Sequence, residues 1–181
     1  MTSAPDRQDM RPANTTINPD EFRSAFRNHA AGVAVITADL GDGPVALTAT
    51  SVVSVSAEPP ILAFSLSASS SASPSIKRAS TVVVHLLTDR DLALAQLCST
   101  SGADRFSNSA VWSRLDGGEP VFHLATRWLR CRVLHRVEPD GGSTLIVASV
   151  MDAGGGQAEG GQPLVYYDRQ WHGLSGASRL N

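Results

Sequence analysis

The chain has 181 residues, of which 42% are hydrophobic and 18% are charged, and its formal net charge at pH 7 is −2. This length suits one domain with a proper core, and the low charge excludes general disorder. The basic residues are scattered arginines with Lys77 as the only lysine, a usage associated with GC-rich bacterial genomes. Because there is no basic tract, we expect neither nucleic acid nor a membrane surface as a partner.

The two ends of the chain are expected to be tails around a single domain. Residues 1–17 lack the apolar core of a secretory signal, and no stretch approaches the roughly 18 to 20 apolar residues of a membrane span. We therefore expect a cytoplasmic protein with a disordered tail over 1–17, one domain over 18–175 and a C-terminal tail over 176–181. Cys98 and Cys131 show no metal-ligand spacing and are expected to be buried thiols.

A short amphipathic helix is predicted at the start of the domain. Asn18 is a helix-capping residue, Pro19 occupies the first helical position and Glu21 follows three residues after the cap. Phe22 and Phe26 then fall on one face, so the pattern predicts a helix to about Ala30.

Most of the remaining chain has the character of β-strands. Residues 32–38 are rich in Val, Ile and Thr, and residues 45–56 alternate apolar with hydroxyl side chains, which predicts one half-buried strand. Segments 61–66 and 81–87 are nearly all apolar, as in strands buried on both faces. Further strands are predicted at 129–137, 145–150, 164–167 and near Trp171, with a glycine-rich loop over 154–161.

Helices are few and short in this pattern. One is predicted at about 74–79 after Ser73, and a second follows the capping sequence of residues 88–91, with Leu94, Leu97 and Cys98 on one face. Many short strands without regular βαβ alternation predict a mainly β fold, namely a closed or nearly closed antiparallel barrel with short helices.

Seven serines occupy the eleven positions from Ser65 to Ser75. Hydroxyls and free backbone amides at a strand end that leads into a helix suit a phosphate group, although a serine cluster is also typical of a solvated loop. Upstream, Thr48, Thr50 and Ser51 are suited to hydrogen-bond the polar edge of a flat heterocycle. Glycine-rich nucleotide-binding motifs, a nucleophile elbow and a zinc motif are all absent from the sequence, and its five histidines are isolated from one another.

Several ordered blocks together resemble the flavin reductase-like, FMN-binding split-barrel family, the reductase components of two-component flavin monooxygenases. The blocks span about residues 20 to 175: FRSAF at 22–26, GVAVIT at 32–37, LTATS at 47–51, SVS at 54–56, Pro59-Pro60, FSL at 64–66 with Ser70 and Ser71, DRF at 104–106, LRC at 129–131 and PLVYY at 163–167. The resemblance implies a homodimer of antiparallel, six-stranded, Greek-key split barrels with flavin near the dimer interface.

The resemblance also implies a flavin site. The backbone and hydroxyls of Thr48, Ala49, Thr50 and Ser51 would face the isoalloxazine ring and the ribityl chain. The phosphate would be held by Ser65, Ser67, Ser70 and Ser71, with Arg105 as a nearby cation and Phe106 packed close by. Trp171 and His172 are candidates for the nicotinamide side.

Two positions depart from the family pattern. Ala46 stands where many members have glycine, so its methyl group would tighten the backbone approach. Many reductases carry Gly-Asp-His ahead of the strand that follows Thr144, and Ser143 occupies the position of that histidine. A serine hydroxyl can donate a hydrogen bond but cannot supply positive charge.

The resemblance therefore implies an NAD(P)H:flavin oxidoreductase. It would pass a hydride from NADH or NADPH to FMN or FAD, and the reduced flavin would diffuse to a separate flavin-dependent monooxygenase. Two alternatives stay open: a non-enzymatic flavin carrier or redox sensor on the same barrel, which the missing histidine favours, and an apolar-ligand module without flavin.

Overall fold

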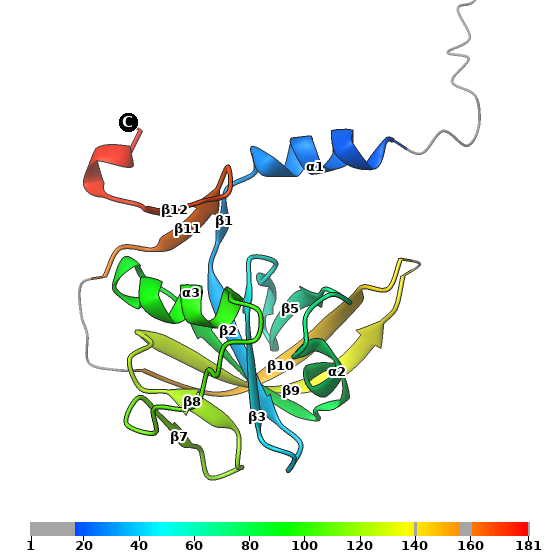
Figure 1. The fold of residues 1–181 in the computed structure, drawn as a ribbon, viewed down its shortest axis with the longest axis vertical. Helices are drawn as coiled ribbons and strands as arrows, with labels where there is room; N and C mark the ends of the chain where they lie inside the picture. Colours follow the sequence, from blue (N-terminus) through cyan, green and yellow to red (C-terminus); the bar gives the residue numbers. More distant parts are fainter. Residues whose placement is uncertain (1–16, 140, 156–160, 181) are drawn as a thin grey trace, which may run out of the picture.

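A computed structural model describes residues 17–139, 141–155 and 161–180 (Figure 1). The expected tail over 1–17 therefore lies outside the described residues except for Ile17, and so does most of the glycine-rich loop. Within the described part of the chain, no helix is both long and apolar enough to cross a bilayer.

Twelve strands and three α-helices make up the described chain. The helices are α1 (Pro19–Arg27), α2 (Ser73–Arg78) and α3 (Leu92–Ser99), with single 3₁₀ turns at Asp89–Asp91 and Gly176–Ser178. The strands are β1 (Ala31–Gly32), β2 (Ala34–Asp39), β3 (Pro44–Ala49), β4 (Val53–Ala57), β5 (Pro60–Leu66), β6 (Thr81–Leu86), β7 (Trp112–Arg114), β8 (Pro120–Phe122), β9 (Arg127–Val137), β10 (Thr144–Gly154), β11 (Leu164–Tyr167) and β12 (Gln170–Gly173). The predicted mainly β fold with short helices is confirmed.

The principal sheet is antiparallel throughout, in the order β3-β2-β6-β9-β10-β5-β4. Strands β1, β11 and β12 form a second sheet, and β7 pairs with β8. The order of the principal sheet is linear, so it gives no ladder that closes the expected barrel. It holds seven strands where the resemblance implied six.

Strand β4 corrects the prediction of one continuous strand over 45–56. The chain leaves the sheet over residues 50–52, so β3 and β4 lie at opposite edges of the same sheet. The Ser51 hydroxyl bonds both backbone groups of Ser65 on β5, with O···O and N···O distances of 3.2 and 3.0 Å. This side chain connects the end of one edge strand to the opposite side of the sheet.

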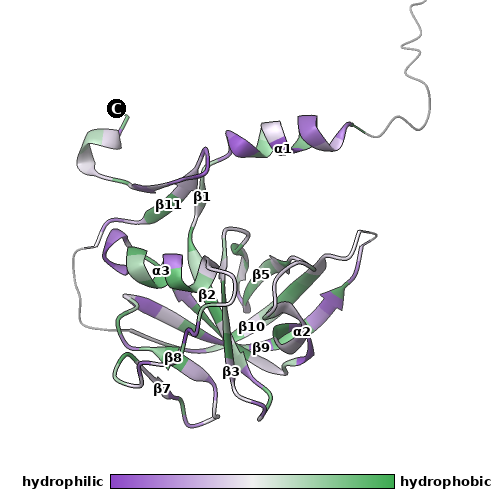
Figure 2. Ribbon diagram, viewed as in Figure 1, coloured by the Kyte–Doolittle hydropathy of each residue, from purple (hydrophilic) through white to green (hydrophobic). Residues whose placement is uncertain are grey.

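The core lies on both faces of the principal sheet, where Figure 2 shows the hydrophobic central strands. One cluster, beneath α2, contains Ile36, Phe64 and Ile146, and the other, beneath α3, contains Val35 and Phe122. Adjacent residues Val35 and Ile36 enter different clusters because successive side chains of a strand point to opposite faces. The buried strand predicted at 81–87 is confirmed, since residues 82–85 of β6 are all buried.

Helix α1 stands apart from the body in Figure 1. The Asn18 side chain accepts a hydrogen bond of 2.9 Å from the Asp20 amide, as the predicted cap requires, but the helix ends at Arg27 rather than near Ala30. No residue of α1 is buried, although the rings of Phe22 and Phe26 contact each other at 4.7 Å.

Candidate functional site

The hydroxyl hollow, as we name it, is a cavity of about 250 Å³ where the end of β3 meets β5. It gathers seven of the ten residues predicted to bind flavin, together with Ser143. Its lining is Leu47, Thr48, Ala49, Thr50, Ser51, Ser65, Leu66, Ser67, Ser70 and Ser143. Apolar strand residues and hydroxyls alternate around one space, a surface suited to a flat ligand with polar edges.

Some of these hydroxyls already have protein partners. Thr48 donates to the Ala95 carbonyl of α3 at 2.7 Å, and Ser51 bonds the backbone of Ser65. The hydroxyls of Thr48 and Ser51 therefore hold the lining of the hollow in place. The backbone of residues 48–51 and the Thr50 side chain are left to contact a ligand.

The serine loop between β5 and α2 is held by its own hydrogen bonds. Ser67 and Ser69 share a bond of 2.8 Å, and the Ser73 hydroxyl donates to the Ser67 carbonyl at 2.6 Å. Within the described chain the hydroxyls of Ser70 and Ser71 have no hydrogen-bond partner, so they are available to a phosphate. Helix α2 has only six residues and begins after Ala72 rather than after a side-chain cap, so its dipole adds little here.

A second cavity, also of about 250 Å³, adjoins the hydroxyl hollow at the Ser70–Ser71 junction. We call it the arginine hollow, and its lining is Pro44, Val45, Ala46, Ser71, Ala72, Ala103, Asp104, Arg105 and Phe106. Its lining includes Ala46, which stands where many family members have glycine. Ala46 is fully buried.

Arg105 is the cation of the arginine hollow. Its guanidinium donates to the carbonyls of Cys98, Ala103 and Thr100 at 3.3, 3.4 and 2.8 Å, which fixes the end of α3 and keeps the charge beside Ser71. Phe106 stacks on Phe122 with ring centroids 5.2 Å apart and holds this loop against the core.

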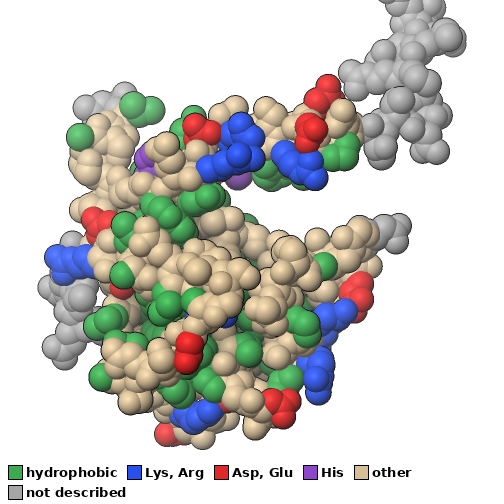
Figure 3. Space-filling model, in the orientation of Figure 1, with side chains coloured by type: hydrophobic (Ala, Val, Ile, Leu, Met, Phe, Trp, Pro, Cys, Tyr) green, Lys and Arg blue, Asp and Glu red, His purple; other side chains and the backbone are tan. Residues whose placement is uncertain are grey.

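A larger groove of about 640 Å³ continues from the hydroxyl hollow, with which it shares Thr50, Ser51 and Ser65. We call it the α1 groove because α1 forms one wall and the β11–β12 hairpin another. Its lining is Phe22, Arg23, Phe26, Arg27, His29, Ala31, Thr50, Ser51, Val53, Ser65, Tyr166, Tyr167, Asp168 and Arg169. Figure 3 shows basic side chains on α1 above the open space that separates this helix from the body.

The family model named "Flavin reductase like domain" matches residues 26–175, which is most of the chain. The protein belongs to this family. The adjoining hollows fit the flavin that the family name implies: the hydroxyl hollow offers a flat, polar-edged space, and Ser70, Ser71 and Arg105 offer donors for a phosphate.

Relatives and solved structures agree with this membership. The chain is 38% identical over 161 residues to an NADH:FMN oxidoreductase of Rhodococcus qingshengii, covering 88% of this chain and 83% of that one. It is 33% identical over 147 residues to the reductase component of a 4-nitrophenol and 4-nitrocatechol monooxygenase of Rhodococcus opacus, covering 81% and 76%. The crystal structure of a flavin reductase domain protein from Arthrobacter sp. FB24 superposes with a TM-score of 0.80 at 31% identity, over 86% of this chain and 95% of that chain.

The residues predicted for the nicotinamide side of this flavin reductase-like protein do not lie together. Ser143 lines the hydroxyl hollow, whereas Trp171 packs on Tyr166 at 4.8 Å and His172 contacts Tyr167 at 5.8 Å. Trp171 and His172 line none of the three cavities described above. The hairpin that carries them presents Tyr167 and Arg169 to the α1 groove instead.

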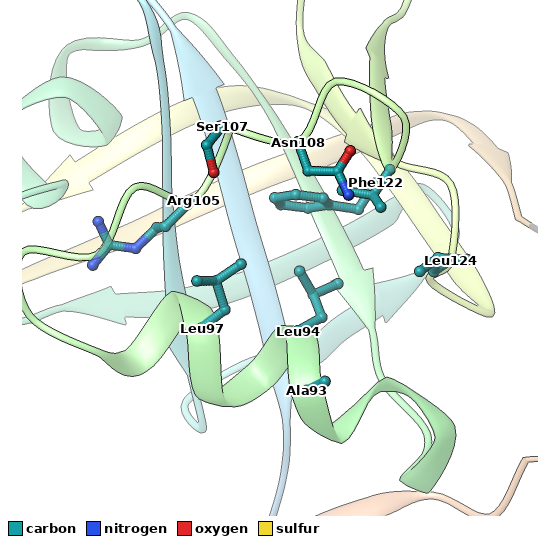
Figure 4. A pocket seen from close by; sticks show the side chains of 9 residues that line it. Ala93, Leu94, Leu97, Arg105, Ser107, Asn108, Phe122 and Leu124 are labelled. Atoms are coloured by element: carbon teal, nitrogen blue, oxygen red, sulfur yellow. The ribbon is translucent and has the colours of Figure 1, made fainter.

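An apolar cavity of about 220 Å³ lies on the other side of Arg105, between α3 and the loop that follows it (Figure 4). Leu94 and Leu97, which were predicted to share one face of α3, line this cavity opposite Phe122. No pattern in the sequence predicts this cavity, because it depends on how the 103–111 loop packs over α3.

Three reactive side chains outside these cavities are buried in the core and structural. Burial raises the pKa of the thiols of Cys98 and Cys131 to about 12, so both are protonated, and the expectation of buried thiols is confirmed. His85 is fully buried between the Val35 carbonyl and the Phe122 amide. No cluster of metal-ligand side chains occurs in the part of the chain that the structure describes.

Proposed function

We propose that the protein is an NAD(P)H-dependent flavin reductase that supplies reduced flavin to a separate monooxygenase. The observation that carries this proposal is the pair of adjoining hollows with the free Ser70 and Ser71 hydroxyls and Arg105, in a chain related to an NADH:FMN oxidoreductase. The relatives are named as oxidoreductases and reductase components, which favours the enzyme over a flavin carrier or sensor.

The residues needed for this chemistry are few. When bound, the flavin would supply a hydride acceptor at N5 and the nicotinamide a hydride at C4, so the contribution of this chain's own residues is to position the two rings and exclude water. The backbone of residues 48–51 would hold the ring edge, the serine loop and Arg105 would hold the phosphate, and the half-buried walls would exclude water. FMN is the flavin, and NADH the donor, that are named for the relative.

The proposal includes a homodimer with flavin near its interface. Val53 and Val55 are exposed by 55% and 57% on β4, an edge strand beside the hydroxyl hollow. A second copy packed along β4 would cover these two valines. We place the dimer in the cytoplasm, where reduced nicotinamide dinucleotides are available.

The first test is oxidation of NADH and of NADPH, followed by absorbance, with and without added FMN and FAD. We expect oxidation that depends on flavin, with FMN preferred to FAD. Tight flavin quenching without any oxidation would contradict the reductase and favour the carrier. If the protein neither binds flavin nor oxidises NADH or NADPH, it shares the fold of the family but not this function.

A further inference from the structure

The α1 groove contains more positive than negative charge that is free to meet a ligand. Arg23, Arg27 and Arg169 line it, and Asp168 is the one carboxylate among its lining residues. Arg23 is balanced by Asp20, with Nη1 and Oδ1 2.6 Å apart. Within the described residues, the side chains of Arg27 and Arg169 have no hydrogen-bond or ion-pair partner.

Arg169 is held in a backbone conformation that favours glycine. It and Asp168 form the two-residue turn between β11 and β12, with φ values of +62° and +46°. Such hairpin turns prefer Asn-Gly, because both central residues need positive φ. Non-glycine residues in this region are strained, and strained residues concentrate at functional sites.

The turn is also fixed in place next to α1. The Asp168 amide donates to the Arg27 carbonyl at 3.1 Å, which joins the turn to the end of the helix. The C-terminal end of α1 carries partial negative charge, which the neighbouring Arg27 offsets. Arg169 is therefore the groove residue whose positive charge is least committed to the protein itself.

The position of the groove indicates which anion this charge would meet. The groove opens directly from the hydroxyl hollow through Thr50, Ser51 and Ser65, so a dinucleotide whose nicotinamide stacks at that hollow would extend into it. The rings of Phe26 and Tyr167 on the groove walls offer contact surfaces for a second base. Arg169 would supply the positive charge that the hydroxyl of Ser143 cannot provide.

We propose that the α1 groove binds the diphosphate of NAD(P)H and that Arg169 is its principal positioning cation. This rests on the proposed function, since it assigns the second substrate of the same reaction. FAD also carries a diphosphate. The experiment must therefore distinguish binding of NAD(P)H in this groove from binding of FAD.

The test uses the full-length protein with ADP-ribose, which carries the diphosphate and adenosine without the nicotinamide. Binding is measured by calorimetry for the parent protein, Arg169→Gly and Arg169→Lys. Glycine is favoured at this turn, so Arg169→Gly should fold at least as stably as the parent, which thermal unfolding checks. We expect Arg169→Gly to weaken ADP-ribose binding roughly fivefold and to raise the KM for NADH similarly, and Arg169→Lys to stay within about twofold.

The matched control is Asp168→Gly, which relieves the same kind of backbone strain but removes the opposite charge. We expect it to strengthen ADP-ribose binding, because it removes the one carboxylate of the groove lining. We expect FMN affinity by fluorescence quenching to be unchanged in all variants. Equal weakening by both glycine variants would assign the effect to the turn and overturn the proposal. Weakened FAD binding with unchanged ADP-ribose binding would assign the groove to FAD and also overturn it.

A third outcome would assign the groove to a second copy of the chain: Arg169→Gly would change the mass in solution without changing ADP-ribose binding. Failure of the proposed function is a separate result, because the parent protein would then oxidise no NADH with any flavin. If the parent oxidises NADH while Arg169→Gly matches it in both KM and ADP-ribose affinity, only the assignment of the α1 groove is wrong.

Discussion

At the scale of single residues, the serine loop divides into hydroxyls that build the loop and hydroxyls that are left for a ligand. Ser67, Ser69 and Ser73 bond to one another or to the loop backbone. Ser70 and Ser71 have no hydrogen-bond partner among the described residues and lie where the two hollows meet. The count of seven serines could not make this division, because it depends on which hydroxyl reaches which carbonyl.

Replacing the free hydroxyls tests the phosphate position. Ser70→Ala with Ser71→Ala should weaken FMN binding about tenfold or more, since each hydrogen bond to a charged group contributes about 1.5 to 3 kcal/mol. Fluorescence quenching of FMN measures the affinity. Ser69→Ala is the matched control, because its hydroxyl is bonded within the loop and it lines neither hollow. Unchanged affinity in the double variant would place the phosphate elsewhere.

Ser143 tests the departure from the family pattern. It lines the hydroxyl hollow, so an imidazole at this position would reach the same space. Ser143→His should raise kcat/KM for NADH by about threefold or more, because an imidazolium adds charge where a hydroxyl adds only a hydrogen bond. The gain should grow as pH falls toward the pKa of the imidazole. A pH-independent rate equal to that of the parent protein would show that other groups position the dinucleotide.

At the scale of elements, one side chain joins three strands of the core. His85 of β6 lies 3.0 Å from the Val35 carbonyl of β2 through Nδ1, and its Nε2 accepts from the Phe122 amide of β8 at 3.1 Å. Because Nε2 accepts, the proton must be on Nδ1 and the ring is neutral. Burial lowers the pKa of His85 from 6.5 to about 4, although the bond to Val35 acts in the opposite direction.

This histidine makes the stability of the fold depend on pH. The unfolded chain binds a proton at His85 below about pH 6.5 while the folded chain stays neutral to about pH 4, so stability is complete above the higher value and falls between the two. The loss should approach about 3 kcal/mol at pH 4. Urea unfolding at several pH values measures it. His85→Gln, which lacks a titrating group, should be less stable at pH 7 but lose less stability over the same range; equal slopes would contradict the assignment.

The strands and helices differ in how well the pattern predicted them. The buried β6 and the cap of α1 follow from local composition, and both are found. Residues 45–56 alternate without interruption, yet they form β3 and β4 at opposite edges of the sheet. Alternation reports which side chains share a face but not whether the strand keeps the same neighbour. The bond from Ser51 to Ser65, 14 residues away, marks where the chain turns.

At the scale of the whole molecule, the hydroxyl hollow shares lining residues with the α1 groove, and it neighbours the arginine hollow through the consecutive Ser70 and Ser71. Residues from β3, β5, the serine loop, α1 and the β11–β12 hairpin contribute to the lining of these three spaces. The exposed valines of β4 lie beside this lining, and Val53 is part of the α1 groove. A dimer that used this face would also shape the site.

Charge placed on β4 tests the homodimer. Val53→Lys with Val55→Lys should shift a dimer to monomer, because two desolvated ammonium groups are costly in an apolar interface. Sedimentation measures the mass at micromolar concentration. Leu124→Lys is the control, since Leu124 is also exposed but lies beside the apolar cavity near α3. A parent protein that is already monomeric would end the proposal.

The sequence by itself determined the class of fold, the family and seven of the residues that meet in the hydroxyl hollow, because these depend on local pattern and on motifs in fixed order. The tertiary structure alone decided the rest: that Thr48 and Ser51 brace the walls, that Trp171 packs away from the hollows, and that Arg169 reaches a groove beside Thr50. The reason is physical. Which hydroxyl is already bonded, and which distant turn lies next to a strand end, is set by long-range packing that no stretch of sequence contains.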